Sequence, residues 1–234
     1  MSVEAKLSES SDSLPKKRRV GRPNQVTLEQ ILDAVAVIGL DRMTLQSVAL
    51  ALDVTSGALY RHVKSREDLV DRFVARVTSR FPTPTAEGKD WPEWARGFAD
   101  ALLDMYASAP GIADYTIGQT HTSDSVLSRH ETSIRIARDY GFDEVGALYA
   151  TRAIVEFVAG WVAREQRRAA IGVSQGLHPD EVFRRHVVEV VPEKYPKLSA
   201  SLRAAAGLKV SRRYKYTLDA LIAGLAQTVH RPDA

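Results

Sequence analysis

Residues 44–69, TLQSVALALDVTSGALYRHVKSREDL, decide the fold of the N-terminal part of this chain. Apolar residues at helical spacing predict two short amphipathic helices joined by a tight polar turn, the second of them over residues 57–63. In that second helix Leu59 and Val63 face the core, which leaves the polar residues toward solvent. A helix-turn-helix pair of this kind places its second helix in the major groove of DNA while the first crosses the phosphate backbone. The pattern therefore predicts a DNA-binding unit.

Two flanking helices complete a small helical domain. Thr27 is a good N-cap for a helix over residues 28–39, and Ser65 begins a longer helix that ends near Arg80. The next residues, FPTPTAEG at 81–88, hold two prolines and a glycine, which interrupt helices. We therefore expect three parts, a disordered or basic segment over 1–21, a helix-turn-helix domain over 22–80 and a second domain over 89–234.

Positive charge is concentrated in the first of these domains. The net charge of the whole chain is only +3, but residues 16–66 hold nine Lys and Arg against four Asp and Glu. Residues 81–234 hold 19 of each. Because DNA phosphates attract Lys and Arg, this distribution favours DNA binding by the N-terminal domain.

A basic run precedes the helix-turn-helix domain. Residues 1–15 are rich in Ser and acids and are expected to be disordered. Lys16 to Arg19 and the tripeptide Gly21-Arg22-Pro23 then follow. Two interpretations stay open: a solvated basic tail, or an arm that lies in the minor groove of A·T-rich DNA, which we favour.

The candidate DNA contacts come from this arm, from the start of the first helix of the pair, and from the second helix and its borders. Ser and Thr hydroxyls reach base edges or phosphates, Arg reads guanine, and helix N-terminal amides bind phosphate. The candidates are Arg22, Thr44, Thr55, Ser56, Gly57, Tyr60, Arg61, His62 and Lys64.

Several function classes are disfavoured by the composition. The chain has no cysteine, and its six histidines form no metal-binding motif, so neither a metal site nor a cofactor is expected. No nucleophile and base set or phosphate loop is present, and no catalytic residue is predicted, so an enzyme is not expected. No apolar run suggests a membrane span or a signal peptide, so we expect a cytoplasmic protein.

Helical periodicity continues through the second domain, and nothing in it suggests a strand. Together with the first domain this predicts an all-α protein. The expected helices cover 91–108, 111–118, 123–140, 143–169, 179–190, 192–206 and 211–229, with a mobile loop from Gly172 to Pro179.

A family resemblance rests on residues 22–80 and especially on Leu59-Tyr60-Arg61-His62-Val63-Lys64. This segment resembles the N-terminal domain of TetR-family transcriptional regulators. Weaker similarity continues at Asp90-Trp91, at Gly141-Phe142 and in the helix from Ala147 to Gln166. The resemblance implies an all-helical homodimer that binds a small molecule in its C-terminal domain, and this ligand would alter the separation of the two DNA-binding units.

Dimerisation also follows from DNA recognition itself, because one short helix contacts too few base pairs for useful specificity. The long apolar helices over 147–165 and 214–229 are the best interface candidates. In the last helix an apolar stripe is predicted to form the interface, or alternatively to be buried within its own subunit. Its members are Leu218, Leu221, Ile222 and Leu225.

A ligand pocket is predicted in the second domain, where aromatic and apolar residues share helix faces. Its candidates are Trp94, Phe98, Leu102, Tyr106, Tyr115, Glu156 and Trp161. Glu156 stands out because it interrupts an apolar run, and a buried carboxylate needs a partner. That partner is either the ligand or an arginine such as Arg152 or Arg135.

The tetracycline-responsive members of the family hold a magnesium-linked drug with a histidine and an acid, and Tyr115 and Arg164 stand near those places in this chain. A shifted alignment would instead bring in His121 and Glu165. We therefore expect a largely apolar small molecule other than magnesium-tetracycline.

The sequence thus predicts a ligand-responsive repressor that binds a palindromic operator in double-stranded DNA as a homodimer and is released by a small-molecule effector. The alternative is an architectural DNA-binding protein that uses its basic arm in the minor groove and has no effector. An enzyme with an attached DNA-binding domain is the least supported class.

Overall fold

The computed structural model describes residues 26–118, 123–189 and 192–229, and within these ranges all regular structure is helical. This confirms the predicted all-α fold. The helices are α1 (Leu28–Ile38), α2 (Leu45–Ala51), α3 (Ser56–Leu59), α4 (Arg66–Arg80), α5 (Trp91–Ser108), α6 (Ile112–Gly118), α7 (Asp124–Asp139), α8 (Glu144–Gln175), α9 (Pro179–Glu189), α10 (Pro196–Ala206) and α11 (Val210–Ala226).

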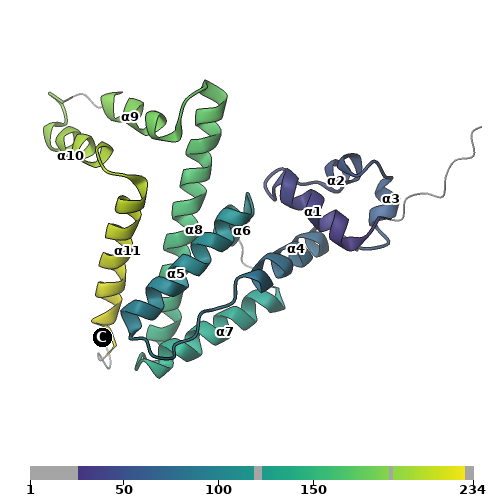
Figure 1. Ribbon diagram of the computed structural model, residues 1–234, viewed down its shortest axis with the longest axis horizontal. Coiled ribbons are helices and arrows are strands. Elements are labelled where there is room, and N and C mark those ends of the chain that lie inside the picture. The colour runs from purple at the N-terminus through teal and green to yellow at the C-terminus, as the bar shows by residue number, and fades with distance from the viewer. Residues whose placement is uncertain (1–25, 119–122, 190–191, 230–234) are drawn as a thin grey trace, which may run out of the picture.

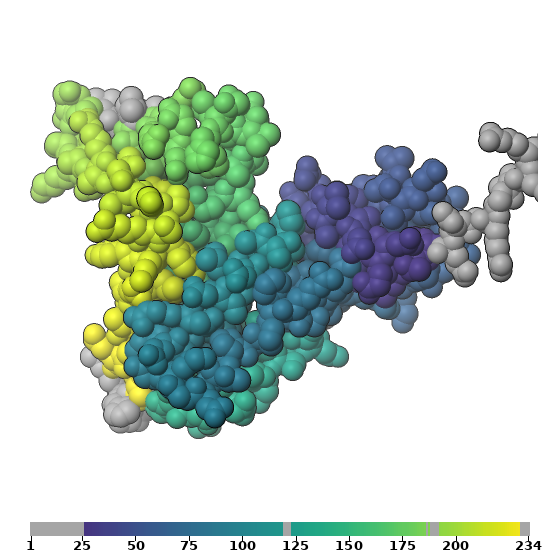
Figure 2. Space-filling model, viewed as in Figure 1, coloured from purple at the N-terminus to yellow at the C-terminus, as the bar shows by residue number. Residues whose placement is uncertain are grey.

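Helices α1 to α3 form a small unit at one end of the molecule, which we call the N-terminal unit, and α4 leads from it into the helical body (Figures 1 and 2). The predicted cap at Thr27 is present, and Thr44 caps α2 in the same way. The Thr27 hydroxyl accepts a hydrogen bond from the Gln30 amide at 3.3 Å, and the Thr44 hydroxyl accepts one from the Ser47 amide at 2.9 Å. Such caps satisfy amides that have no partner inside the helix.

The second helix of the pair is shorter than predicted. Helix α3 ends at Leu59, and a turn carries the chain on to Val63, whose amide donates to the Leu59 carbonyl. The next helix then begins: Asp68 accepts a hydrogen bond from the Lys64 amide at 2.8 Å, and Ser65 caps α4. The bond from Lys64 is the main reason that the pKa of Asp68 lies below its usual value.

The body is organised around α8, which packs against α5, α6, α7, α9 and α11. Helix α8 was expected to end at residue 169 but continues to Gln175. Gly172 does not end the helix; it lets the returning chain come close, and the Leu177 amide donates to its carbonyl at 2.7 Å. Gly176, in the left-handed conformation with φ 65°, is the actual C-cap, so the expected loop from Gly172 is too long by four residues.

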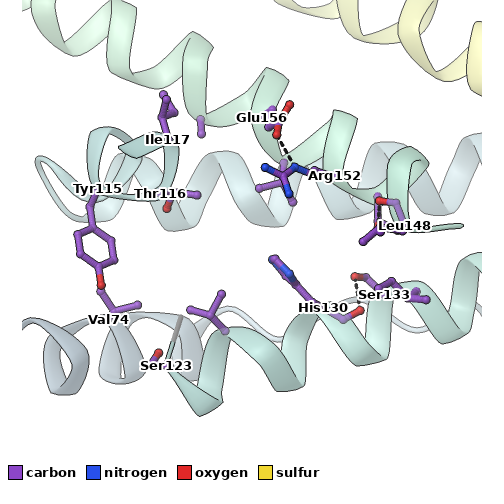
Figure 3. A pocket seen from close by; sticks show the side chains of 15 residues that line it. Val74, Tyr115, Thr116, Ile117, Ser123, His130, Ser133, Leu148, Arg152 and Glu156 are labelled. Carbon is purple, nitrogen blue, oxygen red and sulfur yellow. Dashed lines mark hydrogen bonds and ion pairs between the residues drawn. The ribbon is translucent and has the colours of Figure 1, made fainter. Parts of the chain in front are cut away.

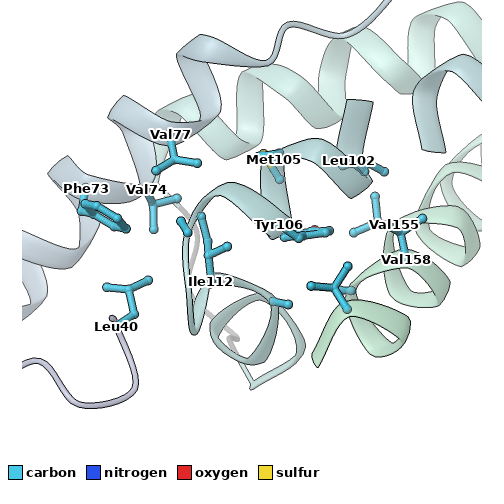
Figure 4. Packing of buried hydrophobic residues seen from close by; sticks show 14 of the residues in the cluster. Leu40, Phe73, Val74, Val77, Leu102, Met105, Tyr106, Ile112, Val155 and Val158 are labelled. Atoms are coloured by element: carbon cyan, nitrogen blue, oxygen red, sulfur yellow. The ribbon is translucent and has the colours of Figure 1, made fainter. Parts of the chain in front are cut away.

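One continuous apolar core joins the N-terminal unit to the body. It runs from Leu40 through Phe73 and Val74 of α4 to Tyr106 and Val158 (Figure 4). The predicted linker 81–88 is not helical, but it is held in place. Trp94 Nε1 donates to the Pro84 carbonyl at 3.0 Å. The two parts of the chain are therefore packed together rather than loosely tethered.

Helix α8 also revises one expectation about membranes. Of the helices in the described ranges, it alone is long and apolar enough to cross a membrane by length and composition, although no such run was expected. Within the fold, 44% of that stretch is buried against the surrounding helices. A central helix of a helical bundle has the same composition, because it is apolar on most of its circumference.

Candidate functional site

The N-terminal unit presents most of its predicted DNA contacts on the surface. Thr55, Gly57, Arg61 and Lys64 are exposed, and the Tyr60 ring is 56% exposed. Ala58 and Leu59, between them, are buried and hold α3 against the unit. This alternation of anchored apolar residues and outward polar residues suits a helix that meets a DNA groove.

Two candidates, Ser56 and His62, are half-buried. Thr44 is exposed, but its hydroxyl already serves as the N-cap of α2. A cap hydroxyl keeps its own proton for a phosphate oxygen, so this role does not conflict with DNA contact. Arg22 and the basic arm lie outside the described residues, as does the expected disorder of residues 1–15.

A cavity of about 420 Å³ lies in the body between α4, α6, α7 and α8 (Figure 3). Helix α7 faces it with Val126, His130 and Ile134, which follow one another at one-turn spacing. The other residues that line the cavity are Val74 from α4, Tyr115, Thr116 and Ile117 from α6, Ser123 and Ser133 around α7, and Leu148, Thr151, Arg152, Val155, Glu156 and Ala159 from α8. A cavity of this size, with apolar walls and a few polar groups, is typical of small-molecule sites.

Three hydroxyls of this cavity already donate to nearby main-chain carbonyls. Thr116 donates to Ile112 at 3.0 Å, and Thr151 donates to Ala147 at 2.9 Å. Ser133 donates to the carbonyl of His130 at 2.9 Å. These hydroxyls therefore offer a ligand acceptor oxygens rather than donors.

His130 and Tyr115 are the titratable cavity residues whose environment changes their acidity. Burial lowers the pKa of His130 below 6.5, and the positive charges of Arg152 and Arg129 lower it further. Burial likewise raises the pKa of Tyr115, with a smaller contribution from Asp71. Both side chains are therefore uncharged near neutral pH, and each has a hydrogen-bonding atom for a ligand.

Four of the predicted pocket residues do not line this cavity. Trp94, Phe98 and Leu102 are fully buried in α5, where the Trp94 and Phe98 rings stack with centroids 5.1 Å apart. Tyr106 is also fully buried, which raises its pKa to about 12. The shared helix face that suggested a pocket wall is instead packed against other helices. The prediction for these four residues is corrected accordingly.

The remaining candidates divide. Tyr115 and Glu156 line the cavity, whereas Trp161 packs against Phe157 and against Tyr214 of α11. Glu156 is not buried as expected; its side chain is 59% exposed and accepts a 2.6 Å hydrogen bond from Arg152 Nε. The predicted arginine partner is therefore present, and it lies at the edge of the cavity.

The apolar stripe of the last helix faces inward. Leu218 and Ile222 are 4% and 0% exposed within the single chain, and Leu221 and Leu225 are half-buried. A side chain without exposed area has none to bury against a second subunit, so Leu218 and Ile222 are core residues of their own chain. The prediction that they form an interface is corrected for these two.

The positions compared with the magnesium-linked drug site are dispersed. Tyr115 lines the cavity, Arg164 lies over the Trp161 ring, and Glu165 pairs with Arg168 at 2.7 Å. His121 lies outside the described residues. Within the described ranges no group of three or more His, Asp or Glu side chains is placed to hold a metal ion.

Sequence reasoning missed most of the cavity lining, above all His130 and Val74. The available signal was the repeat of Val126, His130 and Ile134 at one-turn spacing, in which a histidine replaces an apolar residue. A histidine on the otherwise apolar inward face of a helix indicates that this face borders a space in which a polar group can lie.

Comparisons with known proteins agree with this architecture. The family model described as "Tetracyclin repressor-like, C-terminal domain" matches residues 83–229, which is more than half of the chain. The Tetracycline repressor protein class D of Escherichia coli is 26% identical over 160 residues, covering 65% of this chain and 72% of that protein.

Solved structures share the fold. The Streptomyces coelicolor TetR family protein ActR in complex with actinorhodin has a TM-score of 0.71 at 20% identity, covering 88% of this chain and 99% of that one. A TetR variant from Acinetobacter baumannii AYE in complex with minocycline has a TM-score of 0.63 at 21% identity, covering 88% and 94%. The family match, the helix-turn-helix pair and the helical body agree, and the chain belongs to the TetR family of transcriptional regulators.

Proposed function

We propose that this regulator is a ligand-responsive repressor, which binds a palindromic operator as a homodimer and releases it when a small molecule fills the cavity. One observation carries the proposal: α4 belongs to both sites. Val74 of α4 lines the cavity, while Arg76, two residues further on, bonds Asp33 of α1 at 2.7 Å and Glu29 at 3.3 Å. A change in the cavity wall is therefore transmitted directly to the N-terminal unit.

The switch needs two states with different affinity for the ligand. Because α4 contacts α5 and α7 as well as α1, a ligand that displaces Val74 changes the direction in which α4 leaves the body. In a dimer this alters the distance between the two α3 helices. Operator half-sites lie about 34 Å apart, so a modest change removes the match to successive major grooves.

The homodimer is proposed on the same reasoning about specificity, with the outward faces of α8 and α11 as contact surfaces. Tyr149 of α8 and Tyr216 of α11 are 63% and 78% exposed. Exposed aromatic residues on long helices are typical of subunit interfaces. The half-buried Leu221 and Leu225 are available at the edge of this surface.

The effector is proposed to be a small molecule with an apolar body and a few polar groups, since the lining is mixed rather than mainly aromatic. Two structural neighbours, solved in complex with actinorhodin and with minocycline, support binding of a small molecule by this fold. We propose no cofactor and no metal, and we expect the protein to act in the cytoplasm as a regulator without enzymatic activity.

Selection of binding sites from random double-stranded DNA tests this function. The full chain should enrich a two-fold symmetric sequence, bind it with two subunits per site, and lose affinity steeply with salt. Enrichment of A·T-rich DNA without symmetry would favour the architectural alternative. Deletion of residues 1–23 separates the two readings further, because a repressor keeps its site preference with a modest loss of affinity.

A further inference from the structure

Two side chains of the cavity carry N–H donors that the cavity walls do not use. The His130 ring has no side-chain or main-chain partner among residues 26–118, 123–189 and 192–229, although its main-chain carbonyl accepts from Ser133. The Arg152 guanidinium gives its Nε to Glu156 at 2.6 Å, which leaves its terminal nitrogens for another acceptor. The hydroxyls of Thr116, Ser133 and Thr151, in contrast, donate to main-chain carbonyls.

These two donors come from different helices and approach each other. His130 extends from α7 toward the guanidinium of Arg152 on α8, across the cavity (Figure 3). A group held between them would contact both walls at once. Guanidinium groups bind carboxylate and similar oxyanions with strong, directional hydrogen bonds.

The local charge also favours an anion. Arg152 and Arg129 both act on the His130 ring, and each disfavours a further positive charge there. Of the cavity lining residues, Glu156 alone is acidic, and it lies at the edge beside Arg152, their side chains being 59% and 65% exposed. An anionic oxygen beside His130 would therefore be attracted by two guanidinium groups and opposed mainly by Glu156.

The same cavity also has apolar lining. Val74 of α4, Val126 of α7 and Val155 of α8 line it, and Tyr115 of α6 contributes a ring. Such a surface favours a hydrophobic ring or chain, which gains about 25 cal/mol for each Å² of apolar surface removed from water. The polar and apolar lining residues together match a molecule with one anionic end and one hydrophobic body.

On the basis of the proposed function, in which the cavity holds an effector, we propose that this cavity selects an organic acid. Its anionic oxygen is held between Arg152 and His130, and its hydrophobic body lies against Val74, Val126 and Val155. Glu156 is the internal competitor: it occupies part of Arg152 until the ligand anion arrives.

A matched pair of fluorescent probes tests this selectivity. The sulfonate 8-anilinonaphthalene-1-sulfonate and the neutral N-phenyl-1-naphthylamine share one ring system and differ in the anionic group. Titration of the full-length protein should give tighter binding of the sulfonate. Arg152→Gln should weaken the sulfonate about tenfold, as expected for loss of a charge-assisted hydrogen bond, and change the neutral probe less than about twofold. His130→Gln should act in the same direction.

Three further variants identify the site. Glu156→Gln should tighten the sulfonate about threefold, because Arg152 loses its competitor. Arg135→Gln is the matched control, since Arg135 also forms an exposed i,i+4 pair, with Asp139, but does not line the cavity; it should change neither probe. Ala159→Phe fills the cavity and should weaken both probes alike, and circular dichroism checks that each variant is folded.

Unchanged sulfonate binding in Arg152→Gln, or equal losses of both probes, would overturn the proposed selectivity. If the neutral probe binds the cavity as tightly as the sulfonate and also releases DNA, the proposed selectivity for an anion is wrong, while the ligand-responsive function stands. If a probe of either charge fills the cavity and DNA binding does not change, the proposed function is wrong instead. The two failures are therefore distinguishable.

Discussion

Arg129 of α7 donates a hydrogen bond from Nη2 to the carbonyl of Thr78, 2.9 Å away in the last turn of α4. The same nitrogen also donates to the carbonyl of Phe81, where the linker begins. Arg129 is only 8% exposed, and its Nε and Nη1 are buried without a partner in the described structure. A positive group at a helix C-terminus satisfies carbonyls that the helix leaves unpaired. Arg129 thus joins the cavity helix α7 to the end of the helix that carries the N-terminal unit.

Replacement of this arginine should therefore weaken the fold. Arg129→Met removes the cost of burying a guanidinium, but it leaves the Phe81 carbonyl without its donor and the Thr78 carbonyl with the Phe81 amide alone, so we expect the free energy of unfolding to fall by about 1–2 kcal/mol. Urea denaturation followed by circular dichroism measures the change. Arg135→Met, an exposed site on the same helix, should stay within about 0.5 kcal/mol of the wild type. An Arg129→Met protein as stable as the wild type would show that the contact contributes nothing.

DNA recognition should depend on the exposed residues that follow α3. Tyr60→Ala or Arg61→Ala should lower operator affinity by about 1–3 kcal/mol, which is about fivefold to 150-fold, without lowering thermal stability, because neither side chain is buried. Arg61→Ala should also reduce the salt dependence of operator affinity if Arg61 contacts a phosphate. Fluorescence anisotropy with the selected operator measures both effects, with Arg135→Ala as control. Wild-type affinity in both variants would exclude this surface from DNA binding.

Gly111 holds a close approach between the body and the N-terminal unit. It has φ +84°, a Cβ placed there would lie 2.7 Å from the Asp41 amide nitrogen, and the neighbouring Pro110 carbonyl accepts from the Leu40 amide at 3.0 Å. Gly111→Ala should therefore destabilise the protein by about 1–3 kcal/mol.

Gly97 provides the opposite control in the same thermal denaturation experiment. It lies in α5 with nothing within 4 Å of an added Cβ, so Gly97→Ala should stabilise by about 0.5–1 kcal/mol. If Gly111→Ala and Gly97→Ala changed the stability equally, the close approach of Gly111 to Asp41 would not be required for stability.

The acid sensitivity of folding should include a contribution from His130. Burial, then Arg152 and Arg129, lower the pKa of His130 below 6.5 in the folded protein, whereas the unfolded chain takes up the proton near 6.5. Since the unfolded state then binds more protons, stability present above pH 6.5 is lost as the pH falls through 6.5 toward the lower folded pKa. Glu156 and Tyr115 also face this cavity. The pH dependence of stability is therefore compared between the wild type and a variant in which only His130 is replaced.

His130→Gln should lose less stability than the wild type between about pH 7.5 and about pH 5.5 in urea denaturation. His178→Gln changes an exposed histidine outside the cavity and should keep the wild-type dependence. Identical losses in the wild type and His130→Gln would contradict the buried, electropositive setting of this ring.

Local signals in the sequence were sufficient for most helices. The helix predicted at 91–108 is α5, because Asp90 and Glu93 form a capping box and Pro92 fits the first turn. The end of α8 was misplaced because Gly172 resembles a helix terminator, while the close contact with Leu177 that requires a glycine is visible only in the folded chain.

The cavity was harder to predict, for a physical reason. Apolar spacing identifies the inward face of a helix but not whether that face meets another side chain or an empty space. Trp94 and Phe98 satisfy the pattern of a pocket wall, yet they stack in the core, whereas Val74 and His130 border the cavity. The stripe of Leu218 and Ile222 was ambiguous in the same way, between its own core and a partner.

Operator affinity with the cavity empty and with the cavity filled tests most directly whether the two sites are coupled. The compound is chosen as one that raises the melting temperature of the wild type but not of Ala159→Phe, whose cavity is blocked. At saturation it should weaken operator binding by about 5–150-fold, and operator DNA should weaken binding of the compound by the same factor. A compound that fills the cavity and leaves operator affinity unchanged would contradict a ligand-responsive repressor.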